Sequence, residues 1–373
     1  MLRVAGADHD VAHTEGRIEA ARHAAQHQRS AAETVKQQGR GDTGIDLAGA
    51  RFHEHRRAAG DLALPEGHAA NPALLARQIR EMGKFLGQCR YDAEEPVCHG
   101  RMGYKFAAPM SMTLPDLKTL RDACSVFARD AAAEIMRIYA GDHGARDKAD
   151  RSPVTDADHA AEVIIVAGLR ALTPGRPVVA EEEMAAGRLP GLDGGPFWLV
   201  DPLDGTKEFI KKNGEFTVNI ALVEDGKVTL GIVLAPATDT LWRGASGLGA
   251  DKSQDGGAFI RITTRSPPPE GLTAFASRST AIFSNLDIWF RNEGLTVAER
   301  KHAGSSLKFC LIAEGLADIY PRFGPTNEWD TAAGQGVLEA AGGEVVTTDG
   351  KPLGYGKPRF SNPHFIARTK GAR

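Results

Sequence analysis

One stretch of the 373-residue chain decides the fold: residues 197–210, which read Phe-Trp-Leu-Val-Asp-Pro-Leu-Asp-Gly-Thr-Lys-Glu-Phe-Ile. The four leading apolar residues predict a short buried strand that ends at Asp201. The Pro-Leu-Asp-Gly run predicts a turn, and a helix is expected to start at Gly205 and Thr206. Taken alone, the pattern describes either a capped turn or a functional site, because both place carboxylates between a strand and a helix.

Two further acidic clusters stand at the ends of predicted elements. Glu181-Glu182-Glu183 follows an apolar strand at 177–180, and Asp330 stands where a helix through 331–341 begins. Each alone is explained by a solvated loop or a helix cap. Three such clusters together predict a Mg²⁺ site, because carboxylate oxygens are preferred ligands of this hard cation. Paired metal ions can clamp the attacking and leaving oxygens of a phosphoryl displacement.

The residues next to these carboxylates suit the same chemistry. The main-chain carbonyl of Leu203, between Asp201 and Asp204, is free to be a neutral oxygen ligand. The Thr206 hydroxyl is placed to orient a metal-bound water. The amides at the start of the following helix suit a phosphate oxygen.

The rest of the pattern predicts an α+β fold of stacked layers. Helices are expected at 117–139, after the turn at 152–155, around 307–314 and at 331–341. Strands are expected at 177–180, 197–200, 218–223, 228–234, 240–245, 258–263, 272–276 and 344–347, with a hairpin turn at 224–227. Three prolines at 267–269 mark a junction, so we expect two closely associated halves, 112–265 and 266–373.

Composition limits the function classes. A formal net charge of -3 argues against a nucleic-acid polymer or an anionic membrane as the main partner. No run of 18 apolar residues predicts a membrane-spanning helix, and the first ten residues lack the apolar core of a signal peptide. The four cysteines form no CxxC pair and are expected to be free thiols. We therefore expect a cytoplasmic protein, with peripheral attachment to the inner membrane as an alternative.

Residues 1–111 differ from the rest. They hold 8 of the 12 histidines, no tryptophan and few β-branched residues, so we expect a low-order extension that is dispensable for activity. One helical stripe, Leu75, Ile79, Met82 and Leu86, is expected to form a weak helix. The pairs His53/His55 and Cys98/His99 lack a second half at ligand spacing, so no metal site is expected there. An alternative is that translation starts at Met110 or Met112.

Three longer stretches carry a family resemblance. Residues 197–210 resemble the signature of the inositol monophosphatase superfamily, residues 329–343 its second signature and residues 148–158 its early motif. The similarity runs from Leu114 to the C-terminus. It implies the layered αβαβα sandwich of the inositol monophosphatase and fructose-1,6-bisphosphatase type.

Within the superfamily, the sequence is similar to the 3'(2'),5'-bisphosphate nucleotidases of the CysQ type. Lys207-Glu208 stand where inositol phosphatases usually carry Thr-Asn, and residues 304–315 and 320–330 also resemble this subfamily. The resemblance implies Mg²⁺-dependent hydrolysis of adenosine 3',5'-bisphosphate to AMP, with the sulfated analogue PAPS as a second substrate giving APS. It also implies a role in nucleotide recycling linked to sulfate assimilation, and sensitivity to Li⁺.

The resemblance also implies roles for single residues. The ligands of two or three Mg²⁺ ions would be Glu181, Asp201, the Leu203 carbonyl, Asp204 and Asp330. Asp158 would pair with Thr206 to activate the attacking water. The substrate contacts would be Gly205, Thr206, Lys207, Ser305, Lys308, Arg322 and Asp330. Without the motif, Lys308 and Arg322 would be ordinary surface charges.

The chain departs from its relatives at two positions. Thr280 stands where a histidine usually follows residues 277–279, so one nucleotide contact and the substrate preference are in question. Glu183 is often aspartate in relatives, with little expected consequence. Two alternative functions are an inositol or sugar monophosphatase and a non-catalytic nucleotide- or metal-binding regulator. Lys207-Glu208 and the 305–308 run argue against the first, and the retained acidic positions with Thr206 argue against the second.

Overall fold

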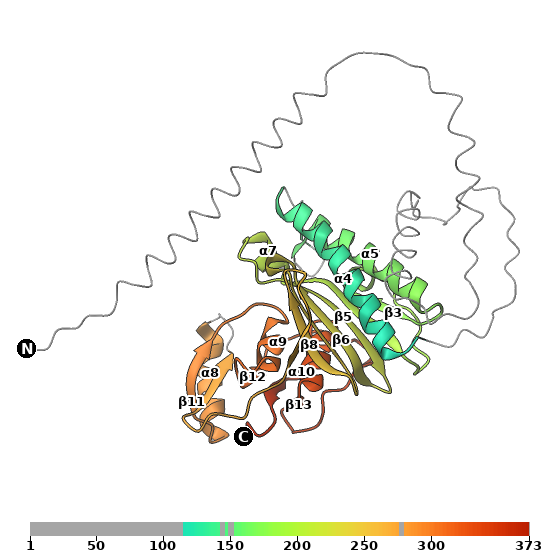
Figure 1. The fold of residues 1–373 in the computed structure, drawn as a ribbon. Coiled ribbons are helices and arrows are strands. Elements are labelled where there is room, and N and C mark those ends of the chain that lie inside the picture. The colour runs from blue at the N-terminus through green and yellow to red at the C-terminus, as the bar shows by residue number, and fades with distance from the viewer. Residues whose placement is uncertain (1–114, 142–145, 148–152, 276–279, 373) are drawn as a thin grey trace, which may run out of the picture. The chain divides into compact units, whose positions relative to one another are not determined.

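A computed structural model describes residues 115–141, 146–147, 153–275 and 280–372 (Figure 1). The predicted extension 1–111 lies outside the described residues, together with its helical stripe and its His and Cys pairs. So do residues 148–152 of the early motif and residues 276–279 before Thr280.

Two helices form the first layer. α4 (Leu117–Tyr139) and α5 (Asp156–Leu172) pack side by side on one face of the larger sheet (Figure 1). The predicted stripe of α4 is buried, with Cys124 and Ile135 fully enclosed. The two helices approach closely because α5 carries Gly168, where a Cβ atom would lie 2.9 Å from the Phe127 ring.

The larger sheet has seven strands in chain order. They are β3 (Val178–Ala180), β4 (Phe197–Asp204), β5 (Thr217–Glu224), β6 (Lys227–Ala235), β7 (Thr240–Ala245), β8 (Gly249–Gln254) and β9 (Ile260–Ile262). β3 runs parallel to β4, and every later pair is antiparallel. The predicted hairpin joins β5 to β6, and both central turn residues have positive φ, Asp225 at 50° and Gly226 at 72°. An Asp-Gly pair accepts these angles at low cost.

Two helices lie between the sheets as the middle layer. α9 (Leu307–Ala313) and α10 (Ala332–Ala340) cover the face of the larger sheet opposite α4, and both also contact strands of the smaller sheet. The approach is tight, because a Cβ atom at Gly231 of β6 would lie 2.2 Å from the Ala333 carbonyl oxygen. The core between the sheets is therefore shared by both halves of the chain.

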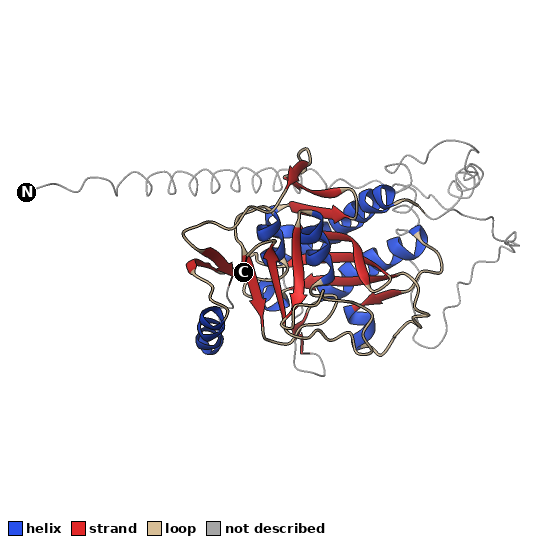
Figure 2. Ribbon diagram, turned by 90° about the horizontal axis from the view of Figure 1, so that it is seen from below, coloured by secondary structure: helices blue, strands red, loops and turns tan. Residues whose placement is uncertain are grey.

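The smaller sheet and one outer helix complete the molecule. Its spatial order is β11 (Val297–Lys301), β10 (Leu272–Phe275), β12 (Ile319–Arg322), β14 (Phe365–Thr369) and β13 (Gly343–Thr347). α8 (Thr280–Asn292) packs Leu286 and Phe290 on its outer face. Helices and sheets thus alternate in five layers, which confirms the predicted αβαβα sandwich (Figure 2). Short elements are β1 (Arg146–Asp147), β2 (Pro153–Val154), α6 (Glu181–Ala185), α7 (Thr206–Ile210) and the 3₁₀ turn Pro236–Thr238.

The sequence prediction was incomplete, mostly in the second half. There it omitted β11, β12, β14 and α8, and in the first half it omitted β8 and extended β9 at both ends. The charged strand β11, with the sequence Val-Ala-Glu-Arg-Lys, lies at a sheet edge and lacks the alternation that marks a half-buried strand. The larger sheet ends at Ile262 and the smaller begins at Leu272, so the predicted junction falls between them, although the division into halves remains a prediction. No helix in the described ranges has the length and apolar character needed to cross a bilayer.

Candidate active site

The carboxylates of the first two clusters meet at one edge of the larger sheet. β3 and β4 are parallel neighbours with Ala180 opposite Val200, so the next residues along the two strands, Glu181 after β3 and Asp201 within β4, are neighbours. The prediction that the strand ends at Asp201 in a turn is wrong, because β4 continues to Asp204. The β4–β5 register shifts between Asp201 and Asp204, and this irregularity turns the strand there. Parallel strands present their carboxyl ends at the same edge, which is where α/β proteins place ligands.

The third cluster reaches the same edge from the second half of the chain. Asp330 directly precedes Thr331, the N-cap of α10, and α10 packs on β5 and β6. Burial raises the pKa of Asp201 well above its usual value, and neighbouring carboxylates raise it further. Those neighbours, in order of effect, are Glu181, Asp204, Asp330 and Asp158. The structure therefore gathers all the predicted acidic residues in one place.

The donor set has the chemistry that a divalent cation requires. Burial raises the pKa of Asp330 to about 8, and the Asp204 carboxylate is the next cause. Within the described part of the chain, no three acidic, His or Cys side chains already surround a point that a metal ion could occupy. Their oxygens are engaged by protein donors: Asp201 Oδ1 accepts from the Leu203 amide at 3.0 Å, and Asp330 Oδ2 from the Asn327 amide at 2.8 Å. These carboxylate oxygens are of the kind that Mg²⁺ prefers.

Asp158 and Thr206 lie together, as the resemblance implies. The Thr206 hydroxyl donates to Asp158 Oδ1 at 3.1 Å and lies 3.4 Å from the Leu203 carbonyl oxygen. Asp158 Oδ2 accepts from the amide and the hydroxyl of Thr155, both at 2.7 Å. Thr155 is the N-cap of α5, so a capping box fixes one oxygen of Asp158 and leaves the other for Thr206.

The acid–base state of Asp158 follows from its surroundings. Its side chain is fully buried, and this burial raises its pKa to about 6. The two hydrogen bonds from Thr155 oppose the shift, and the charges of Glu182 and Glu181 add to it. A carboxyl group titrating near neutral pH is suited to general acid–base chemistry.

A cavity of about 370 Å³ adjoins the carboxylates. Of the predicted site residues it is lined by Asp204, Gly205, Lys207, Ser305, Lys308, Arg322 and Asp330. The lining thus carries three carboxylates, Asp204, Glu208 and Asp330, and three cationic side chains, Lys207, Lys308 and Arg322. The volume is in the range of pockets that hold small ligands, ~300–1,000 Å³.

The basic residues differ in how their donors are used. The Lys308 ammonium is buried and donates to the carbonyls of Ala303 at 3.1 Å and Ser305 at 2.7 Å. Burial lowers its pKa to about 8, although the Asp204 carboxylate opposes that shift. Arg322 donates through Nη2 to the Pro325 carbonyl at 3.2 Å, while its buried Nε has no hydrogen-bond partner among the described residues. Arg322 is therefore the cation best prepared to bind an anion.

Ser305 supports the backbone in this structure. Its hydroxyl donates to the carbonyls of Asp204 at 2.7 Å and Glu215 at 2.8 Å. Gly205 packs directly against it: φ is +94°, and a Cβ atom there would lie 2.3 Å from the Ser305 Oγ. Only glycine fits this position, because the left-handed conformation and the close approach coincide.

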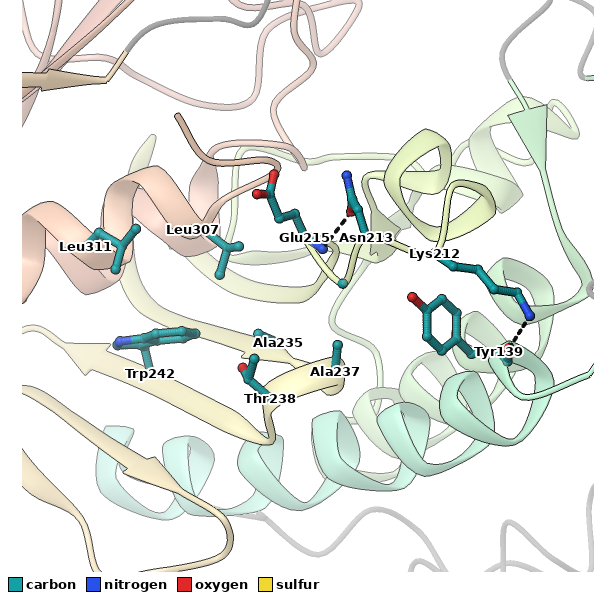
Figure 3. Close-up of a pocket in the computed structure, with 11 residues that line it drawn as sticks. Tyr139, Lys212, Asn213, Glu215, Ala235, Ala237, Thr238, Trp242, Leu307 and Leu311 are labelled. Carbon is teal, nitrogen blue, oxygen red and sulfur yellow. Dashed lines mark hydrogen bonds between the residues drawn. The ribbon is translucent and has the colours of Figure 1, made fainter. Parts of the chain in front are cut away.

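A second cavity, of about 470 Å³, is shown in Figure 3. Its walls come from α4, the β6–β7 turn and α9, and Tyr139, Trp242 and Leu311 point into it. None of the predicted catalytic, metal-binding or substrate-binding residues lines it. The chemistry therefore belongs to the smaller cavity.

Several buried polar residues next to the site were not predicted. Glu162 of α5 accepts from the amides of Glu182 at 2.7 Å and Glu183 at 2.9 Å, and so holds the segment that bears Glu181. Glu328 accepts from the amides of Gly356 at 2.8 Å and Lys357 at 2.9 Å. Asn219 and Ser306 contact Asp204. Glu328 and Ser306 lie inside stretches that carry the family resemblance, whereas Glu162 and Asn219 gave no signal.

The two departures from the family pattern have different settings. The Glu183 carboxylate pairs with Arg170 at 2.8 Å, on the side of α6 that faces α5. That contact explains why an acidic residue of either length is acceptable there. Thr280 begins α8, and the place of its side chain is outside what the structure describes.

Comparisons with known proteins agree with this geometry. The model of the inositol monophosphatase family matches residues 116–370. The chain is 46% identical over 252 residues to the "3'(2'),5'-bisphosphate nucleotidase CysQ" of Escherichia coli K12, covering 65% of this chain and 97% of that protein. The CysQ of Buchnera aphidicola is 42% identical, with 67% and 93% covered. The crystal structure of CysQ from Bacteroides thetaiotaomicron superposes with a TM-score of 0.57 at 37% identity, covering 68% of this chain and 98% of that chain.

Proposed function

Because the chain belongs to the inositol monophosphatase family, we propose that it is a divalent-metal-dependent phosphomonoesterase acting on adenosine 3',5'-bisphosphate. The products are AMP and phosphate, and the sulfated analogue PAPS is a second substrate. Relatives named 3'(2'),5'-bisphosphate nucleotidase match this chain over nearly their whole length. The reaction therefore belongs to the phosphoric monoester hydrolases.

One observation carries the choice of a bisphosphate. The cavity is lined both by predicted metal ligands, Asp204 and Asp330, and by the cations Lys308 and Arg322. A monophosphate needs only the metal side, because its single phosphate is bound there. A second phosphate finds a partner in the guanidinium of Arg322, whose planar fork binds phosphate in two places.

The chain's own residues divide the work of hydrolysis. Two or three Mg²⁺ ions, held by Glu181, Asp201, Asp204, Asp330 and the Leu203 carbonyl, would polarise the phosphate and supply a nucleophilic water. Thr206 Oγ1 donates a hydrogen bond to Asp158 Oδ1, so a lone pair of the same oxygen would accept a hydrogen bond from the attacking water, and Asp158 would take up the proton that this relay releases. Asp158 stays oriented because Thr155 holds its other oxygen.

A phosphate-release assay tests the proposal. Adenosine 3',5'-bisphosphate, inositol 1-phosphate and fructose 1,6-bisphosphate are compared at saturating Mg²⁺ and after removal of divalent cations. We expect the nucleotide to have the highest kcat/KM and chelation to abolish its turnover. A preference for inositol 1-phosphate would make the chain an inositol monophosphatase of the same family. No hydrolysis of any of the three would favour a non-catalytic regulator. The expected cytoplasmic location remains a prediction that cell fractionation would test.

A further inference from the structure

Ser306 joins the two halves of the proposed metal site. It is the N-cap residue of α9 and is 1% exposed. Its hydroxyl lies 3.1 Å from Asp204 Oδ2, which comes from the larger sheet, and 3.0 Å from the main-chain oxygen of Asp330. Both of these oxygens accept a hydrogen bond from the Ser306 hydroxyl, so its single proton is shared between two predicted ligand residues.

Asn219 fixes the direction of that hydroxyl. It lies on β5 directly opposite Asp201 of β4, and it is 1% exposed. Its Nδ2 donates to Ser306 Oγ at 2.9 Å and lies 3.4 Å from Asp204 Oδ2. Because Ser306 accepts this bond, its own proton is directed to the acceptors of the metal site.

Asp204 receives this support at a single oxygen. The Ser306 hydroxyl lies 3.1 Å and the Asn219 amide nitrogen 3.4 Å from Asp204 Oδ2. Both donors reach the same oxygen, Oδ2, so the carboxylate cannot rotate freely. The other oxygen, Oδ1, is the one we assign to the cation.

We infer that Ser306, oriented by Asn219, is a positioning residue that presents Asp204 and the Asp330 segment to the metal. This rests on the proposed function, since it takes Asp204 as a ligand. Neither side chain touches the cation or the substrate. Removing such outer partners of a ligand typically weakens metal affinity or activity by ~10–100-fold.

The test measures Mg²⁺ binding to the full-length protein by calorimetry without substrate, and the Mg²⁺ dependence of kcat separately. Ser306→Ala should weaken Mg²⁺ binding by about 10- to 100-fold and raise the half-activating Mg²⁺ concentration equally. The KM for the nucleotide at saturating Mg²⁺ should stay unchanged. Ser253→Ala is the matched control, because Ser253 of β8 is likewise buried, at 2% exposed, and donates to a main-chain carbonyl, that of Gly257.

Each outcome separates the inference from the proposed function. If Asp204→Asn loses Mg²⁺ affinity while Ser306→Ala keeps the wild-type value, the positioning role is wrong and the metal site stands. If Asp204→Asn keeps the affinity, the assigned ligand is wrong and the inference falls with it. Should Ser306→Ala fail to fold, Asn219→Ala replaces it: a weakened affinity supports the inference and a wild-type affinity overturns it.

Discussion

The acidic and the basic side chains of the site, here called its acidic side and its basic side, balance their charges in different ways. On the acidic side, burial raises the pKa of Asp201 and of Asp330, and the charge of Asp204 raises both further, so their proximity costs free energy in the protein alone. On the basic side, the Lys308 ammonium is already satisfied by two backbone carbonyls. Only Arg322 keeps a buried donor, Nε, without a partner among the described residues.

The acidic side therefore depends on a bound ligand more than the basic side does. The acidic side is complete only with a cation, whereas the basic side is largely built by the fold. Changes on the acidic side should therefore alter turnover and metal binding, and changes on the basic side should alter the KM of the nucleotide.

The largest effect is expected from Asp201→Asn. Turnover should become undetectable at saturating Mg²⁺, because a charged ligand and its transition-state stabilisation are both lost. The metal-free variant should nevertheless melt higher, by about 2–4 °C for each kcal/mol of repulsion removed. Steady-state kinetics checks the loss of turnover, and thermal unfolding in the presence of a chelator checks the rise in melting temperature. Near-wild-type turnover would exclude Asp201 as a ligand. A lower melting temperature would show that repulsion between the carboxylates does not destabilise the metal-free protein.

The second-largest effect is expected at the proposed water-activating pair, Thr206 and Asp158. Thr206→Ala and Asp158→Asn should each lower kcat by about two to four orders of magnitude, with little change in KM. The double variant should be scarcely worse than the worse single variant, because both changes break one relay. The measurement is the full cycle of kcat values at saturating Mg²⁺. If the two losses of kcat multiplied independently, the relay would be wrong, and the role of Thr206 would be limited to starting helix α7.

Arg322 tests the basic side. Arg322→Ala should raise the KM for adenosine 3',5'-bisphosphate by about 10- to 100-fold, as expected for a lost charged hydrogen bond. Arg322→Lys should not restore it, because an ammonium lacks the planar fork. Steady-state kinetics with a nucleoside 3'-monophosphate is the control, since that substrate has no second phosphate. An equal KM increase for both substrates would place Arg322 at the reacting phosphate instead.

A smaller effect should follow from pH. Burial raises the pKa of Asp158 to about 6, and a protonated carboxyl cannot take the proton of Thr206. Turnover should therefore fall as the pH drops through about 6, by roughly tenfold per unit below the inflection. Bound cations lower the pKa, so the inflection should lie at or below that value. The pH profile of kcat in Asp158→Asn should lack this limb, and its persistence would assign the titration to another group.

The smallest effect is expected from removing residues 1–111. No predicted site residue lies there, so a chain that begins at Met112 should keep its specific activity within about twofold. Gel filtration and phosphate release check this outcome. Aggregation or loss of activity would show that the stripe from Leu75 to Leu86 contributes to folding or assembly.

The sequence predicted the first half of the fold better than the second. α4 begins and ends at the predicted residues, and the β5–β6 hairpin follows its Asp-Gly turn, because these signals are local. β12 and β14 pair across more than forty residues of chain, and the short run at 319–322 shows no periodicity of its own. Such strands are set by neighbours that a local pattern does not contain.

The same distinction holds for the site. Asp201, Asp204 and Asp330 were predicted because the pattern puts them at the ends of expected elements, and the structure brings them together. Ser306 and Asn219 were missed because each looks like an ordinary capping or strand residue until the two halves meet. Ser305 and Lys308 line the expected cavity, but their bonds to carbonyls follow from a turn that the sequence does not reveal.

The middle layer has a consequence for how the protein is synthesised. The strands of the larger sheet are complete at Ile262, but α10, which covers one face, begins only at Ala332, 70 residues later (332 − 262). At ~5–20 residues per second, a ribosome needs roughly 4–14 s to make that segment. During this interval the apolar residues of that face lack one of the two helices that cover it. The nascent chain should therefore bind chaperones at this stage, and release by a stop codon before residue 332 should yield an aggregating product.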